Sequence, residues 1–156
     1  MPIKPFYNEL LMNHHHQPAH KHELPNANLT LRGVNPSCGD QITLHLRVND
    51  VGIIQDGSFT GEGCAISQAS ADIMLGMIIG KDRTKALHLC SLFRKLIRGT
   101  ISDSELDEWG EAAVLKDVQR MPSRIRCVVL SWTTLEEILK SGGQGPQKDA
   151  EMVMRH

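Results

Sequence analysis

Hydrophobic and polar residues alternate along one segment of the chain. Over residues 42–48 (ITLHLRV) every second residue is aliphatic and the residues between are polar. Because successive side chains of a strand point to opposite faces of a sheet, this pattern predicts a strand with one buried face. Residues 29–34 and 51–60 are also typical of strands, and turn-forming residues separate the three segments. We therefore expect a three-stranded antiparallel sheet over residues 29–61.

The hydrophobic period changes after the third predicted strand. In residues 66–79 and 83–98 the apolar side chains recur at intervals of three and four, which is typical of helices with one buried face. Asp82 is placed to cap the start of the second helix, and Gly99 is placed to end it. We expect short helical turns over residues 100–122.

The two ends of the chain differ in pattern. Residues 3–13 have helical spacing, whereas residues 14–28 contain five histidines and two prolines and predict an extended loop. A last helix is expected over residues 123–141, and the polar tail over residues 142–156 is expected to be disordered. These elements predict a single α+β domain over residues 1–141: a three-stranded antiparallel sheet with helices packed on one face.

Composition narrows the possible functions. The chain has 156 residues, 17 Lys and Arg against 18 Asp and Glu, and a net charge of −1. Such a balance argues against binding to nucleic acid or to an anionic membrane surface. Aromatic residues make up 4% of the chain, which excludes a base-stacking surface and predicts an aliphatic core. No apolar run has the roughly 20 residues of a membrane span, and no signal peptide is evident, so the predicted location is the cytoplasm.

Three of the four cysteines lie at boundaries between predicted elements. Cys38 lies in a Pro/Gly turn before a strand, and Cys64 lies in a glycine-flanked turn before a helix. Cys127 is expected in the first turn of the last helix. A helix N-terminus lowers the pKa of a thiol, so Cys64 and Cys127 are candidates for thiolates. Cys90 lies on the apolar stripe of its helix and is expected to be a small buried hydrophobic residue.

The spacing of these residues leaves a metal site open as one interpretation. Asp40 is two residues from Cys38, so a single turn offers two ligands. Together with Cys64 and Cys127 they would form a tetrahedral set of three sulfurs and one oxygen, which suits zinc. By spacing alone Asp40 is equally well explained as a turn residue, with the thiols incidental.

Other motifs are absent or ambiguous. The tract of five histidines is either a metal-binding segment or a solvated loop, and its sequence does not decide between them; these are His14, His15, His16, His20 and His22. The chain has no GxSxG motif, no glycine-rich phosphate loop and no HExxH motif, so a hydrolase or a nucleotide-dependent enzyme is not supported.

Three motifs, in order, resemble the IscU/NifU N-terminal family of iron–sulfur assembly proteins. They are NPSCGD at residues 35–40, FTGEGCAISQASA at 59–71 and PSRIRCVVLSW at 122–132. The resemblance covers about residues 5–140 and is closest to the SufU branch of the family. The IscU branch has a histidine directly before the third cysteine, and Arg126 takes that position here.

This resemblance implies a function. It implies a zinc site formed by Cys38, Asp40, Cys64 and Cys127. It also implies a partner, a pyridoxal-phosphate-dependent cysteine desulfurase of the SufS type, whose persulfide sulfur would be accepted by Cys38. Other SUF assembly proteins are further expected partners. Since three thiolates and a carboxylate exceed the charge of Zn²⁺, a nearby cation is expected, and Arg124 is the candidate.

The sequence leaves two alternatives open. The same four ligands could hold a nascent [2Fe–2S] cluster, which would make the chain a scaffold; Arg126 in place of histidine favours sulfur transfer instead. The second alternative is a purely structural zinc domain, which would have no effect on any desulfurase. In none of these interpretations is the chain a stand-alone enzyme, and a monomer is expected.

Overall fold

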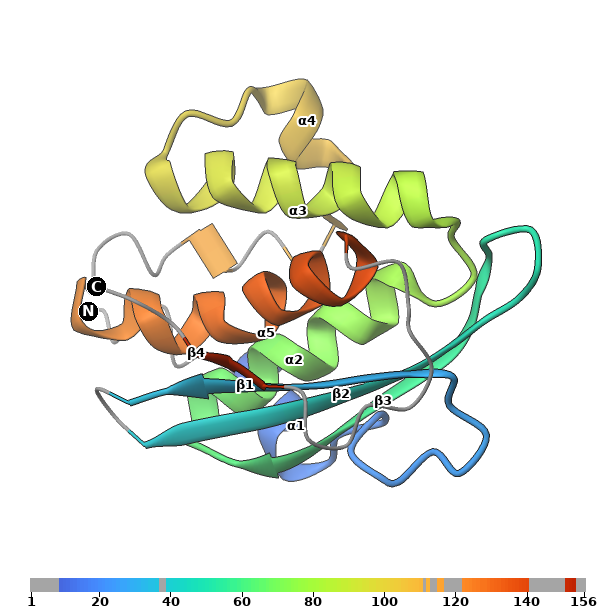
Figure 1. The fold of residues 1–156 in the computed structure, drawn as a ribbon. Coiled ribbons are helices and arrows are strands. Elements are labelled where there is room, and N and C mark those ends of the chain that lie inside the picture. The colour runs from blue at the N-terminus through green and yellow to red at the C-terminus, as the bar shows by residue number, and fades with distance from the viewer. Residues whose placement is uncertain are drawn as a thin grey trace.

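The computed structural model describes residues 9–36, 39–110, 112, 115–116, 122–140 and 151–153. The elements in chain order are α1 (Glu9–His16), β1 (Leu29–Asn35), β2 (Asp40–Val48), β3 (Ile54–Glu62), α2 (Ala65–Ile78), α3 (Arg83–Arg98), α4 (Asp103–Asp107), α5 (Pro122–Lys140) and β4 (Glu151–Val153) (Figure 1). None of the described helices is both long enough and apolar enough to cross a bilayer.

The first three strands form the predicted antiparallel sheet. β2 lies in the middle, paired with β1 on one side and with β3 on the other. The aliphatic residues of the alternating segment all point into the core, and Ile42, Leu44 and Leu46 are fully buried. The alternating pattern therefore predicted both the strand and its buried face correctly.

The third strand starts later than expected, at Ile54 instead of residue 51. The side chain of Asn49 explains the delay. Its Oδ1 accepts hydrogen bonds from the backbone N–H groups of Val51 and Ile53, at 3.0 and 2.9 Å. These bonds close a local turn, and residues 49–53 are therefore held out of the ladder.

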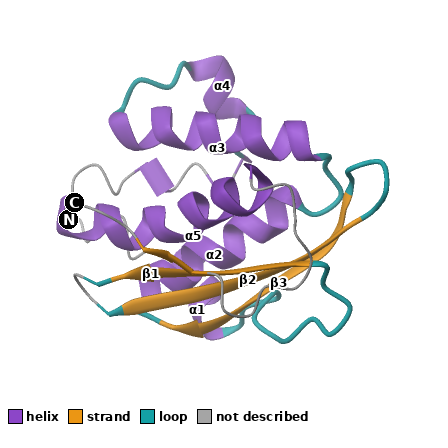
Figure 2. Cartoon of the chain, viewed as in Figure 1, coloured by secondary structure: helices purple, strands orange, loops and turns teal. Residues whose placement is uncertain are grey.

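The helices cover one face of the sheet. α2 and α5 pack against the strands, and α3 packs on α5, which gives the predicted α+β layers (Figure 2). The core is mostly aliphatic, but it also holds a stack of the aromatic rings of Phe93, Trp109 and Trp132. The rings of Phe93 and Trp132 are nearly parallel, with centroids 4.5 Å apart. Composition alone predicted only an aliphatic core and missed this stack.

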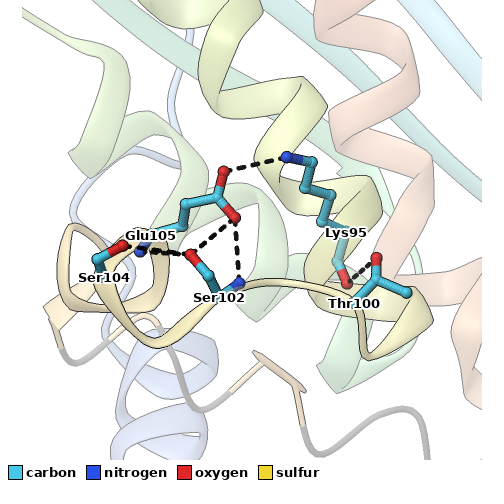
Figure 3. A network of polar contacts seen from close by, with 5 residues as sticks. All are labelled: Lys95, Thr100, Ser102, Ser104 and Glu105. Carbon is cyan, nitrogen blue, oxygen red and sulfur yellow. Dashed lines mark hydrogen bonds and ion pairs between the residues drawn. The ribbon is translucent and has the colours of Figure 1, made fainter.

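The caps of α3 and α4 follow from local sequence. Asp82 accepts a hydrogen bond from the backbone N–H of Lys85 at 2.7 Å, and Gly99 ends α3 in the left-handed conformation, both as predicted. α4 begins with a capping box between Ser102 and Glu105, and Lys95 of α3 lies 3.0 Å from the same carboxylate (Figure 3). The Ser102 backbone N–H, followed by Lys95, lowers the pKa of Glu105 to about 2.

The two ends of the described chain depart from the sequence prediction. α1 continues to His16, beyond the expected end at residue 13, and residues 1–8 lie outside the described part. Glu151–Val153 of the tail form β4, which pairs in parallel with β1. The expectation of a disordered tail is therefore wrong for these three residues, because they cover an edge strand that otherwise has unpaired backbone groups. Residues 141–150 and 154–156 lie outside the described part.

Candidate metal centre

Three of the four predicted ligands come together in space. One side-chain ligand atom each from Asp40, Cys64 and Cys127 lies within 4.8 Å of the other two. They come from the start of β2, the start of α2 and the second turn of α5. The fourth predicted ligand, Cys38, lies outside the described residues. In the sequence it lies between β1 and β2, which pair with each other as far as Asn35 and Asp40.

Asp40 is the first residue of β2 and its side chain is 2% exposed. The backbone N–H of Cys64 donates a hydrogen bond to its Oδ1 at 3.0 Å. A carboxylate is costly to bury unless it is hydrogen-bonded or binds a cation. The bond therefore orients Asp40 toward the thiols and ties the start of β2 to the start of α2.

Cys64 caps the N-terminus of α2. Its Sγ accepts a hydrogen bond from the backbone N–H of Ser67 at 3.4 Å, and the Ser67 hydroxyl donates to the Cys64 carbonyl at 3.1 Å. The pKa of Cys64 is lowered to about 6, chiefly by the hydrogen bond from the Cys127 thiol and further by the Ser67 N–H, against the effect of burial. The lowered pKa favours the thiolate form of Cys64, which is the form that binds metals.

Cys127 lies deeper in its helix than expected. α5 begins at Pro122, so Cys127 lies in the second turn rather than the first, beyond the turn in which the helix dipole lowers a thiol pKa most. Its side chain is 2% exposed. Ser70 of α2 holds this part of α5, because its hydroxyl donates to the Val128 carbonyl at 2.8 Å and accepts from the Trp132 indole N–H at 3.2 Å. No pattern in the sequence singles out Ser70.

Two glycines let the chain approach the cluster closely. A Cβ at Gly63 would lie 2.9 Å from Asp40 Oδ1 and 2.4 Å from Ser67 Oγ. Gly61 has φ +120°, and a Cβ there would lie 2.2 Å from the Gln41 carbonyl oxygen. In the sequence both are typical turn residues, and the structure adds that a side chain at position 63 would displace Asp40 and Ser67.

Cys90 lies in the core as expected, and the structure places Arg124, the candidate cation, in α5. Cys90 is buried in α3, and burial raises its pKa to about 12, so it is a neutral core thiol. Arg124 is half-buried in the first turn of α5, one turn before Cys127. Cys64, Cys90 and Cys127 form no disulfide.

Part of the histidine tract has a structural role. His14 Nδ1 lies 2.6 Å from a carboxylate oxygen of Asp72, and the backbone N–H of His20 donates to the other oxygen at 2.8 Å. Asp72 is buried in α2, so these contacts hold α1 and the following loop against that helix. Within the described ranges the group of Asp40, Cys64 and Cys127 is the one with metal-site geometry, and it includes no histidine.

Comparison with known proteins decides the family. The model of the NifU-like N-terminal domain matches residues 6–140. The chain belongs to this family. Among curated relatives, the iron–sulfur cluster assembly scaffold protein IscU of Thermotoga maritima is 36% identical over 140 residues, covering 90% of this chain and 96% of the relative. The zinc-dependent sulfurtransferase SufU of Bacillus subtilis is 38% identical over 131 residues, covering 84% and 87%.

Solved structures agree with this assignment. An iron–sulfur cluster assembly scaffold protein for the SUF system from Fervidobacterium islandicum has a TM-score of 0.78 and 34% identity, covering 86% of this chain and 96% of that chain. A NifU-like N-terminal protein from Brucella abortus shares the fold, with a TM-score of 0.70 at 17% identity. The resemblance that three sequence motifs indicated is therefore confirmed, and the chain is a member of an iron–sulfur cluster assembly family.

Proposed function

We propose that this chain is a zinc-dependent sulfur acceptor in iron–sulfur cluster assembly. The observation that carries the proposal is the convergence of the Asp40 carboxylate with the thiols of Cys64 and Cys127. The 38% identity to a relative named as a zinc-dependent sulfurtransferase supports the same conclusion. The proposed sulfur donor is the persulfide of a pyridoxal-phosphate-dependent cysteine desulfurase of the SufS type.

The donor set fits zinc. Tetrahedral zinc binds thiolate sulfur at about 2.3 Å and carboxylate oxygen at about 2.0–2.2 Å, so its ligands lie roughly 3.5–3.8 Å apart. The three described ligand atoms lie within 4.8 Å and need only a small contraction to reach that spacing. Cys38 is the proposed fourth ligand, which completes three sulfurs and one oxygen. Bound zinc would keep the thiols deprotonated and protect them from oxidation.

The chain's own residues have distinct proposed roles. Cys64 and Cys127 are held by α2 and α5, and Asp40 is held by the Cys64 backbone N–H, so these three form the fixed part of the site. Cys38 belongs to a Pro/Gly turn and is the proposed acceptor. Its thiolate would attack the outer sulfur of the donor persulfide, forming a new S–S bond while the donor's S–S bond breaks. The donor cysteine leaves as a thiolate, so the transfer needs no external oxidant or reductant.

A second candidate function is that of a scaffold that holds a nascent [2Fe–2S] cluster on the same ligands. The observation in its favour is the 36% identity to the Thermotoga maritima protein, which is named as a scaffold. A carboxylate ligand such as Asp40 would make a bound cluster labile enough to pass on. Arg126 occupies the position directly before Cys127, where the IscU branch has histidine, and this favours the transfer function.

A pair of cysteine variants tests the acceptor role. The purified chain is incubated with a SufS-type desulfurase and cysteine, and persulfide on the chain is measured by intact mass together with alanine release. Cys38→Ser is expected to abolish both persulfide on this chain and stimulation of the desulfurase. Cys90→Ser is the matched control, because Cys90 is buried in the core. Undiminished stimulation by Cys38→Ser would exclude Cys38 as the acceptor.

A further inference from the structure

A pocket of about 120 Å³ lies between α3 and α5, outside the cysteine cluster. Its apolar lining consists of Cys90, Phe93, Ile97, Val129 and Trp132. Its polar lining consists of Arg94, Arg98, Thr133 and Glu136. The proposed sulfur-transfer chemistry uses none of these residues.

The volume of the pocket limits what it can hold. Sites for small molecules and cofactors usually enclose about 300–1,000 Å³, so this pocket is too small for a metabolite of ordinary size. An apolar cavity of about 150 Å³ is known to accept a benzene ring. The pocket therefore matches one large apolar side chain. Two of its lining residues, Phe93 and Trp132, pack against each other with ring centroids 4.5 Å apart.

The polar residues give the opening an excess of positive charge. Arg94 and Lys140 both form ion pairs with the same carboxylate, that of Glu136. The side chain of Glu136 is 16% exposed, whereas those of Arg94 and Lys140 are 46% and 61% exposed. Two accessible cations therefore share one largely buried carboxylate, which leaves a net positive charge. Arg98 adds a third cation in the last turn of α3. An acidic group next to the apolar side chain would complement this charge.

The pocket faces away from the metal centre. With 100° of rotation per residue, the pocket residues of α5 lie roughly 140–240° around the helix from Cys127; they are Val129, Trp132, Thr133 and Glu136. A group bound in the pocket therefore lies on the opposite side of α5 from the clustered thiols and leaves them uncovered.

We propose that this pocket is a docking site for a protein partner that inserts one apolar side chain flanked by acidic residues. Arginine and tryptophan are among the residue types that contribute most to binding at protein interfaces, usually in small pockets like this one. Because the pocket and Cys127 lie on opposite faces of α5, this partner can be bound while the cysteine cluster is engaged by another protein. The inference does not depend on which metal or cluster the cysteines hold.

Two capped tripeptides test the docking site. The probes are Ac-Glu-Leu-Glu-NH₂ and its neutral counterpart Ac-Gln-Leu-Gln-NH₂. Both tryptophans of the chain, Trp109 and Trp132, belong to the aromatic stack, so their fluorescence reports on the pocket. The acidic peptide is expected to cause a saturable change, and the neutral peptide to bind about two- to fivefold more weakly, which is the strength of an exposed ion pair. No saturable change, or equal binding of both peptides, would overturn the proposal.

Three variants assign any binding to the pocket. Val129→Phe is expected to fill the pocket and abolish binding of both peptides. Arg98→Glu is expected to abolish the preference for the acidic peptide. Lys81→Glu is the control, because it reverses an exposed charge outside the pocket and should bind like the unmodified chain. Near-ultraviolet circular dichroism checks that each variant is folded. Unchanged binding by folded Val129→Phe would place the peptide elsewhere and contradict the proposal.

Discussion

Substitution of Gly63 by alanine tests the packing of the metal centre most sharply. The new Cβ would lie 2.9 Å from Asp40 Oδ1 and 2.4 Å from Ser67 Oγ, whereas ordinary contacts begin near 3.4 Å. The carboxylate oxygen must therefore withdraw by about half an ångström and the hydroxyl by about one. The Asp40 carboxylate accepts a hydrogen bond from the Cys64 backbone N–H, and the Ser67 hydroxyl donates one to the Cys64 carbonyl.

The expected effect is a loss of zinc affinity together with a loss of stability. Disturbing residues that orient metal ligands typically lowers metal affinity about 10- to 100-fold. Overpacking of this kind costs about 1–3 kcal/mol of the free energy of unfolding. Zinc affinity is measured by competition with a chromogenic chelator, and stability by urea unfolding of the zinc-free chain.

Gly76→Ala is the matched control. It makes the same chemical change on α2, but its Cβ would meet nothing closer than 3.8 Å. Alanine in a helix interior is favoured over glycine by about 0.5–1 kcal/mol, so this variant should be slightly more stable and bind zinc normally. If folded Gly63→Ala binds zinc as tightly as the unmodified chain, the assignment of Asp40 as a positioned ligand is refuted.

Three further predictions follow from burial and titration. Cys90→Ser should lower the free energy of unfolding by about 1–3 kcal/mol, because it buries a hydroxyl, and should leave zinc stoichiometry unchanged; loss of zinc would contradict the core assignment. Gly33→Ala should cost about 1–3 kcal/mol in urea unfolding, since its Cβ would lie 2.0 Å from Thr134 Oγ1; wild-type stability would refute the packing of β1 on α5. In the zinc-free chain, alkylation of Cys64 by iodoacetamide should rise with pH through about 6, where the thiol deprotonates, and a midpoint near 9 would contradict the lowered pKa.

Local patterns predicted most of the fold. The alternation over residues 42–48 identified the central strand. Successive side chains of a strand point to opposite faces of the sheet, so this pattern can be recognised without knowing which elements pack against it. The caps at Asp82 and Gly99 were equally local, since each depends on backbone groups within a few residues. β4 could not be predicted, because three residues are too few for a pattern and their pairing with β1 is purely tertiary.

The metal centre was predictable only in part. Asp40, Cys64 and Cys127 lie on three different elements, so their spacing in the sequence left a metal site and incidental thiols equally open. The family motifs favoured the metal site, and the structure brings these three side chains together. The supporting contacts were not predictable: Ser70 tethers α5 beside Cys127, and Asp72 anchors the histidine tract, through partners more than 50 residues away in sequence.

Metal content tests the central claim most directly. The untagged chain is purified without added metal and analysed for zinc, iron and acid-labile sulfide. We expect one zinc per chain with negligible iron, and loss of that zinc in Asp40→Ala. Iron with matching sulfide would contradict sulfur transfer and favour the scaffold function. No stoichiometric metal would contradict the site itself, since Asp40, Cys64 and Cys127 would then converge without binding an ion.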